Sequence, residues 1–162
     1  MADKNNKTIN NDGEEILDIY SKGEYPANVL SNFHPKKFVF DGVECASMEG
    51  FLQSLKFKNE KRQREICALV GIDAKNKGQH KFLWKITGNV YWLGKRYKRK
   101  GEEFTRLIFR AYRQLYSQNE DFRLALQSAK GKKIIHSIGK NKKGQTILTA
   151  GEFINCILNI NA

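Results

Sequence analysis

One long amphipathic pattern constrains the fold of this chain more than any other feature. Between Glu102 and Tyr116, apolar residues recur every three or four positions, as Phe104, Leu107, Ile108, Tyr112 and Leu115. At this spacing they share one face of an α-helix. The pattern therefore predicts a helix over residues 102–116. A second helix of the same kind is predicted from about Phe122 to Ala129, with Asn119 as its cap.

Shorter signals on both sides of these helices predict strands and further helices. Strands are expected at 16–20 and 133–137, and a hairpin at 38–45 around Asp41-Gly42, a pair that favours the positive φ values of a tight turn. Helices are expected from Met48 to about Lys58, capped by Ser47, from 60 to 70, ended by Gly71, and at 73–77, closed by Gly78. Thr149 and Glu152 form a capping box for a last helix. Residues 79–100 have no clear period, and no element is assigned to them.

Together these elements predict a single compact α+β domain, mostly helical with a few short β-strands, over residues 15–162. A chain of 162 residues that is 40% hydrophobic suits one domain with its own core. Residues 1–14 are polar and have almost nothing to bury, so we expect a disordered N-terminal tail.

The composition also bears on compartment and cofactors. No apolar stretch approaches the length of a membrane span, and the first residues lack the apolar core of a signal peptide, so a cytoplasmic protein without membrane contact is expected. The three cysteines lie far apart in apolar surroundings and are expected to be buried thiols. The three histidines show no metal-ligand spacing relative to them. Neither a metal nor a cofactor is predicted.

The net charge of +12 is the strongest bulk signal for a partner. Such a charge attracts phosphate groups, in a nucleotide or in a nucleic acid, although a solvated basic surface has the same composition. The charge gathers in two runs, one from Lys95 to Lys100 and one from Lys140 to Lys143. Aromatic residues accompany the first run, where Trp92 and Arg96 are candidate substrate contacts because a base can stack beside a cation. An ordinary amphipathic segment has the same residues.

Three polar residues in the helix after Ser47 could carry chemistry. Glu49, Gln53 and Lys56 stand at i, i+4 and i+7, so they lie within about 60° of one another at the border of an apolar stripe. A glutamate there is partly desolvated, which raises its pKa and suits it to acid–base work. The lysine could hold an anion or attack a sugar aldehyde. An amphipathic helix with a surface Glu and Lys has the same spacing.

A second candidate region follows the predicted strand at 133–137. His136 lies in an apolar strand, where it is either a hydrogen-bonded core residue or a catalyst. The loop after it contains Gly139 and Asn141 among lysines, and such a loop can hold phosphate through its amides and ammonium groups. It does not have the spacing of a Walker motif.

These segments together resemble the NADAR superfamily of YbiA-like proteins. The resemblance begins at Ile19-Tyr20-Ser21, continues through Leu30-Ser31-Asn32-Phe33 and is strongest at residues 47–57, which follow the pattern S-x-E-x-x-x-Q-x-x-K-F. It extends more loosely to Ile135-His136 and covers most of the chain after residue 15. The family's usual Trp-Gly-Asp element has no counterpart after His136, and the chain contains no aspartate after Asp121.

The resemblance implies a YbiA-like fold, a pocket for ADP-ribose-like or ribosyl-phosphate compounds, and hydrolysis of an N-glycosidic bond. Family substrates include early riboflavin-pathway intermediates and ADP-ribosylated guanine. By this likeness Glu49 is the acid–base carboxylate, and Lys56 contacts the substrate or forms a transient imine with the opened ribose. The role of the absent aspartate is either missing or taken by His136 or Glu152. The residues that would shape the pocket are Tyr20, Ser21, Asn32, Phe33, Ser47 and Gln53.

Three functions follow as expectations. The first is an N-glycosidase that cleaves the N-ribosidic bond of an ADP-ribose-like or phosphoribosyl nucleotide. The second is a non-catalytic protein that sequesters an NAD-derived nucleotide, which the absent aspartate favours. The third is a nucleic-acid-directed protein, either a reader or an eraser of ADP-ribosylated bases such as guanine, which the positive charge favours.

Overall fold

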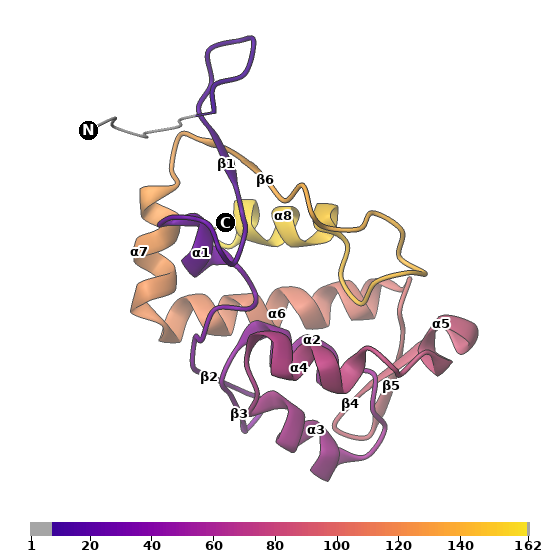
Figure 1. Ribbon diagram of the computed structural model, residues 1–162. Coiled ribbons are helices and arrows are strands. Elements are labelled where there is room, and N and C mark those ends of the chain that lie inside the picture. The colour runs from indigo at the N-terminus through magenta and orange to yellow at the C-terminus, as the bar shows by residue number, and fades with distance from the viewer. Residues whose placement is uncertain (1–7, 162) are drawn as a thin grey trace.

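Eight helices and three two-stranded sheets make up the computed structural model, which describes residues 8–161 (Figure 1). The predicted single α+β domain, mostly helical with short strands, is confirmed. Residues 1–7 of the predicted tail lie outside the described residues. Residues 8–14 form a turn in which the amide of Ile16 donates to the carbonyl of Thr8 at 2.8 Å. No helix within residues 8–161 is long and apolar enough to cross a bilayer.

The first and last strands pair with each other in parallel. β1 (Ile16–Asp18) lies beside β6 (Lys133–Ile135), with Ile16 opposite Lys133. Both strands were expected, and both are shorter than the predicted ranges. The amide of Ile19 adds a hydrogen bond to the carbonyl of Ile135 at 2.8 Å, so the pairing continues past the end of β1.

The predicted hairpin and the helix after it are confirmed. β2 (Phe38–Phe40) and β3 (Val43–Cys45) pair around Asp41-Gly42, whose φ values are +47° and +78°. The side chain of Ser47 then caps α2 (Met48–Ser54) by accepting from the amide of Gly50. The expected end near Lys58 is wrong. After Ser54 the amides of Lys56 and Phe57 donate to carbonyls three residues back, and the carbonyl of Leu55 accepts from the amide of Tyr91 at 2.9 Å instead of continuing the helical ladder.

The next two helices divide the chain differently from the prediction. α3 (Glu60–Cys67) begins at an Asn59 cap and ends before Gly71, so that glycine does not terminate it. Gly71, at φ +51°, opens α4 (Gly71–Gly78) instead. The chain leaves α3 early because the carbonyl of Cys67 accepts from the amide of Ala46, at the end of the hairpin.

The segment without a sequence assignment forms a short helix and a hairpin. α5 (Leu83–Thr87) is followed by β4 (Asn89–Trp92) and β5 (Lys95–Lys98), which pair antiparallel. Leu93 makes the turn at φ +45°, a conformation that a leucine rarely adopts, and Gly94 completes it at +82°. This turn has none of the usual Asn-Gly or Asp-Gly signals.

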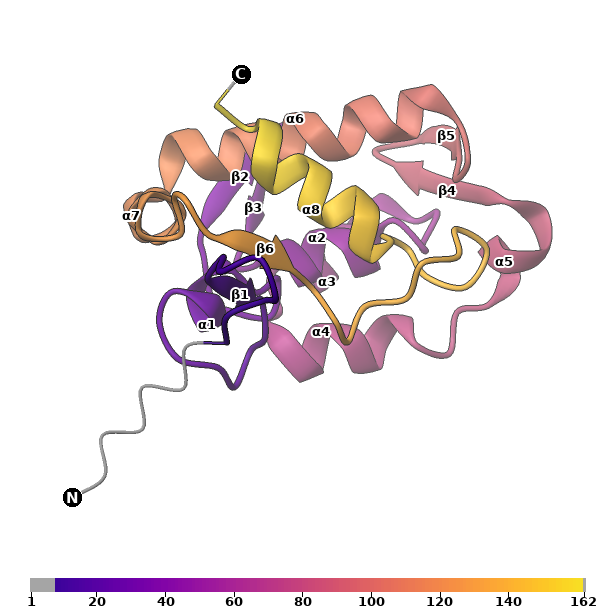
Figure 2. The same ribbon diagram turned by 90° about the horizontal axis from the view of Figure 1, so that it is seen from above.

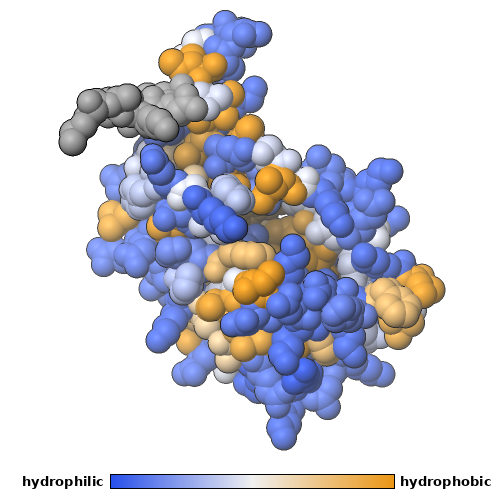
Figure 3. All heavy atoms as spheres, viewed as in Figure 1, coloured by the Kyte–Doolittle hydropathy of each residue, from blue (hydrophilic) through white to orange (hydrophobic). Residues whose placement is uncertain are grey.

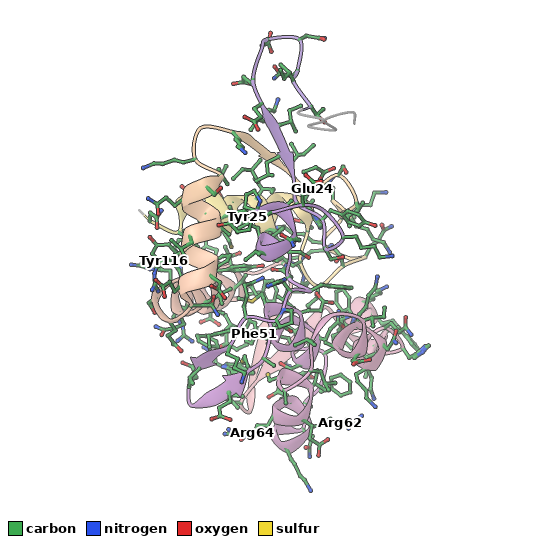
Figure 4. All side chains as sticks on the ribbon, turned by 60° about the vertical axis from the view of Figure 1, so that its left-hand side comes forward. Glu24, Tyr25, Phe51, Arg62, Arg64 and Tyr116 are labelled. Atoms are coloured by element: carbon green, nitrogen blue, oxygen red, sulfur yellow. The ribbon has the colours of Figure 1, made fainter. Side chains whose placement is uncertain are left out.

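The core is organised around α6 (Glu102–Gln118), the helix that the sequence predicts most strongly. α7 (Glu120–Ser128), with the expected Asn119 cap, runs across the end of α6, and α8 (Ala150–Asn159) packs against α6, as Figure 2 shows. Phe51 is fully buried and makes edge-to-face contact with Phe40 and Trp92. In Figure 4, Phe51 lies inside the molecule, whereas Arg62 and Arg64 project outward from α3.

Candidate functional site

A cavity of about 350 Å³ lies between α2, the α4–α5 region and the segment after β6. Figure 3 shows a hollow in this region of the molecular face, with both hydrophilic and hydrophobic side chains around it. Of the residues predicted for the site, the cavity is lined by Ser21, Asn32, Phe33, Glu49, Gln53, Lys56, His136 and Gly139. Segments far apart in the chain therefore meet around this cavity.

Glu49 is the acidic residue among the side chains that line the cavity. Glu49 lies in the first turn of α2, where all the residues are buried, and it exposes only 9% of its surface. Burial raises the pKa of this carboxyl, while the hydrogen bond from Gln53 and the charges of Lys56 and Lys75 oppose the shift. The amide of Gln53 donates to Glu49 Oε1 at 2.8 Å and holds the carboxylate in place. A carboxyl whose pKa is raised holds its proton more firmly than a surface glutamate, which suits it to act as a proton donor.

Lys56 follows the end of α2 and extends along the same cavity. Its Nζ lies 3.4 Å from the carbonyl of Gly78 and 5.7 Å from the centre of the Trp84 ring. Burial lowers the pKa of Lys56 to about 8, although the charge of Glu49 acts in the opposite direction. The amine is therefore mostly protonated at neutral pH but loses its charge in mild alkali.

Gly78 allows Gln53 to approach α4 closely. A Cβ atom at this position would lie 1.8 Å from Gln53 Oε1 and 3.1 Å from Gln53 Cβ, so a larger residue would have to displace the Gln53 side chain. Within residues 8–161, Gln53 Oε1 is a buried oxygen without a hydrogen-bond donor. The glycine thus fixes the position of the side chain that orients Glu49.

Four more lysines surround the cavity. Lys75 comes from α4, Lys85 from α5, Lys81 from the link between them, and Lys140 from the loop after β6. The first three were missed by the sequence analysis, because each resembles an ordinary surface lysine. The sequence did contain one indication: residues 74–101 include no Asp or Glu that could neutralise these lysines. The result is a cavity whose mouth attracts anions.

The segment Ser31–Phe33 forms another part of the lining. The Tyr112 hydroxyl donates to Asn32 Oδ1 at 2.8 Å, which leaves the amide nitrogen of Asn32 free to donate elsewhere. The carbonyl of Asn32 accepts from the amide of Glu49 at 3.1 Å, so this segment and the start of α2 are joined. The Nζ of Lys36, which is buried, donates to the carbonyls of Val29 and Ser31 and anchors the segment from behind.

His136 lines the opposite wall and is held in one orientation. Its Nδ1 lies 2.8 Å from the carbonyl of Ile19, and its ring packs edge-to-face on Phe153. Because a carbonyl can only accept, Nδ1 carries the hydrogen, and in the neutral imidazole the lone pair is therefore on Nε2. Gly139 fits closely over the ring, since a Cβ atom there would lie 2.5 Å from His136 Cδ2 and 2.7 Å from the Cβ of Ala150.

Glu152 does not contribute a second acid to this cavity. Its carboxylate receives two hydrogen bonds from Arg99, at 2.6 and 3.1 Å, and one from the amide of Thr149. These donors and the Arg99 charge outweigh burial, so the pKa of Glu152 is lowered. Arg99 exposes 2% of its surface and also donates to the carbonyl of Thr146, which anchors the Thr146–Thr149 wall. The expectation that Glu152 replaces a missing aspartate in the site is wrong.

Five predicted substrate contacts lie outside the cavity lining. Ser47 is the buried cap of α2, and Trp92 is a core residue whose Nε1 donates to Asp41 Oδ2 at 2.9 Å. Tyr20, Arg96 and Asn141 are exposed at other positions. Within the basic run at 95–100, Arg99 has a structural role, because its buried side chain forms an ion pair with Glu152.

The three cysteines are free and buried, as expected. The Cys45 and Cys67 thiols lie next to each other, and the hydrogen bond between them together with burial raises the pKa of Cys45. Within residues 8–161, no group of three or more His, Cys, Asp or Glu side chains is placed to hold a metal ion.

Known proteins are similar to this chain in sequence and in fold. The family model of bacteriophage protein GP30.3 matches residues 24–162. An uncharacterized 17.1 kDa protein in the Gp30-rIII intergenic region of Enterobacteria phage T4 is 40% identical over 145 residues, which are 89% of this chain and 95% of that protein. The NMR structure of the E. coli protein YbiA matches with a TM-score of 0.58 at 17% identity, over 90% of this chain and 82% of that one. The predicted YbiA-like fold is confirmed.

Proposed function

The chain belongs to the bacteriophage protein GP30.3 family, and we propose that it is an N-glycosidase that hydrolyses the N-ribosidic bond of an ADP-ribose-like or phosphoribosyl nucleotide. The observation that carries this proposal is the buried Glu49, whose raised pKa and fixed orientation stand in a cavity lined by lysines. An acid that must protonate a leaving nitrogen needs such a pKa, and a substrate with phosphate groups needs such a rim.

The reaction divides between two walls of the cavity. Cleavage of the bond between C1′ and nitrogen builds positive charge on the ribose, and a water molecule supplies the new oxygen at C1′. Glu49 gives its proton to the leaving nitrogen, and its carboxylate then stabilises the ribosyl cation. On the opposite wall, the lone pair of His136 Nε2 accepts a proton from the attacking water.

The remaining lining residues hold the substrate. Lys75, Lys81, Lys85 and Lys140 attract the phosphates, and the partly buried Lys56 lies next to Glu49 at the ribose end. The free amide hydrogens of Asn32 donate to a sugar or phosphate oxygen. Phe33 presents an aromatic edge of the cavity to the sugar or base.

The test compares the wild type with Glu49→Gln. This change keeps the size of the side chain and an oxygen for the Gln53 hydrogen bond, but removes the acid. Each protein is incubated with ADP-ribosyl-guanosine, other ADP-ribose conjugates and phosphoribosyl nucleotides, and products are followed by mass spectrometry. We expect the variant to lose at least about 100-fold in turnover, the scale of acid–base catalysis. Glu44→Gln, on the exposed face of β3, is the matched control.

One observation favours binding without cleavage as a second candidate. Among the described residues that line the cavity, Glu49 is the single carboxylate, whereas glycosidases commonly use a pair. If no substrate of the panel is cleaved and an intact nucleotide remains bound at stoichiometric amounts, sequestration replaces hydrolysis. If nothing binds, both candidates fail.

Another observation favours a substrate carried on nucleic acid. α5 exposes Leu83 and Ile86, and Phe82 precedes it with 64% of its surface exposed, beside Lys81 and Lys85 at the cavity mouth. Apolar surface between cations is what unpaired bases and their phosphates contact. Affinity for an ADP-ribosylated oligonucleotide should exceed that for ADP-ribosyl-guanosine and fall steeply with salt. Phe82→Ala should remove the advantage of the oligonucleotide and leave the nucleoside unaffected.

A further inference from the structure

A second cavity, of about 480 Å³, lies between α6 and α8, apart from the lysine-lined one. Apolar side chains line much of it: Ile108 and Phe109 from α6, Cys156 from α8, and Leu148 from the segment before α8. Its size falls in the range of sites that bind small organic molecules. We call it the α6–α8 groove.

Positive charge borders the groove along one helix. Arg106, Arg110 and Arg113 stand at i, i+4 and i+7 of α6, and all three line the groove. Arg106 forms an exposed ion pair with Glu102, and Arg110 forms two hydrogen bonds with Asp41, at 3.0 and 3.1 Å. In the part of the chain that the structure describes, Arg113 has no acidic partner, and its guanidinium lies 5.9 Å from the ring centre of Phe109.

The one acidic side chain of the groove is already neutralised. Glu152 lines it, but both carboxylate oxygens accept hydrogen bonds from Arg99. The groove therefore presents apolar surface and an uncompensated guanidinium together. An anion at Arg113 would gain a charge-assisted hydrogen bond without displacing an existing partner.

We propose that the α6–α8 groove binds a small amphiphilic anion, with an apolar body against Ile108, Phe109, Leu148 and Cys156 and one anionic group at Arg113. The apolar lining contributes affinity through burial, and the guanidinium selects an acid over its neutral analogue. The site is independent of the N-glycosidase proposal, because it shares neither Glu49 nor any lysine with the first cavity.

The two cavities have one segment in common. Leu148 lines both, and Thr146, Ile147 and Thr149 line the first. Arg99 ties this segment to Glu152 through its bonds to the carbonyl of Thr146 and to the carboxylate. A ligand in the groove therefore rests against the back of a wall that closes the lysine-lined cavity.

The test uses anilinonaphthalene sulfonate, an aromatic sulfonate, and its uncharged relative N-phenylnaphthylamine. Binding to the full chain is measured by fluorescence titration, and the site is mapped by amide chemical-shift changes. We expect saturable binding of the sulfonate with shifts on α6 and α8, and at least about tenfold weaker binding of the neutral compound. Arg113→Gln should weaken the sulfonate by about tenfold, as for a lost charge-assisted hydrogen bond. The control Arg96→Gln, an exposed arginine on β5, should stay within about twofold.

Several outcomes overturn the proposal. Unchanged affinity in Arg113→Gln, or equal binding of the neutral compound, would show that the guanidinium selects nothing. Shifts confined to α5 or to the lysine-lined cavity would place the probe elsewhere. Sedimentation at rising protein concentration tests whether a second copy of the chain occupies the groove instead. If a dimer forms, and if Asn155→Phe at the groove rim abolishes that dimer, the occupant is a second copy and the proposal fails.

Discussion

Replacement of Lys36 by methionine should change how the stability of the protein depends on pH. Lys36 exposes 1% of its surface, packs over the Phe122 ring and donates to the carbonyls of Val29 and Ser31. Burial alone lowers its pKa from 10.5 to about 7. Methionine keeps most of the apolar length and removes the titrating amine.

The magnitude follows from the pKa difference between the two states. Below pH 7, Lys36 is protonated in both the folded and the unfolded chain, and its burial carries a constant cost. Between pH 7 and 10.5, the folded chain has released this proton and the unfolded chain has not, so the contribution of Lys36 to stability rises with pH. The full rise is about 5 kcal/mol, from a pKa lowered from 10.5 to about 7.

The assay is urea unfolding of both proteins at a series of pH values and constant salt. The difference in unfolding free energy, wild type minus Lys36→Met, should be flat below neutral pH and grow by about 3 kcal/mol towards about pH 9.5. At neutral pH two effects on this free-energy difference oppose each other: methionine removes the cost of a buried amine, but it leaves the carbonyls of Val29 and Ser31 without their donor. The test therefore uses the change with pH. The exposed Lys37→Met serves as the control and should not produce this rise. A difference that stays constant from pH 6 to 9.5 would refute the idea of a buried, discharging amine.

Three further predictions concern the site and its support. Gly78→Ala should displace Gln53, whose Oε1 would lie 1.8 Å from the new Cβ, and weaken ADP-ribose binding by about tenfold in calorimetry; unchanged affinity would contradict the role of Gly78 in placing Gln53 against Glu49. Glu152→Gln should lower the unfolding free energy by about 3–5 kcal/mol at neutral pH, because it leaves the buried Arg99 without its counter-charge; a loss below 1 kcal/mol would contradict this. Since Lys56 has a pKa of about 8, ADP-ribose affinity should fall as pH rises from 7 to 9, and a Lys56→Met variant should show a shallower fall.

Local signals in the sequence were sufficient for many elements. Ser47, Asn119 and Thr149 cap the helices that they were expected to cap, and Asp41-Gly42 forms the expected turn. Such features depend on a few neighbouring residues, so a single sequence contains the information. The Glu49–Gln53 contact could also be predicted from the sequence, because the two residues are four positions apart on one helix.

Features that depend on contacts between residues far apart in the chain could not be predicted from the sequence. α2 ends where the carbonyl of Leu55 pairs with Tyr91, a partner that no local rule identifies. The hairpin at 89–98 turns through Leu93 in a conformation that local propensity disfavours. Lys75 and Lys85 became part of the site only because α4 and α5 face the loop after β6. Tertiary packing decided each of these cases.

The parallel pairing of β1 with β6 has a consequence for how the protein is made. Ile19 and His136, which are 117 residues apart, meet through one hydrogen bond, so β1 cannot pair with β6 until most of the chain has been translated. Closing so long a loop is slow compared with forming the helices between its ends. A nascent chain that ends after α7 already carries Glu49 and four of the five lysines of the cavity, yet lacks the wall from His136 to Thr149. A premature stop codon there would remove the side chains that face Glu49 across the cavity.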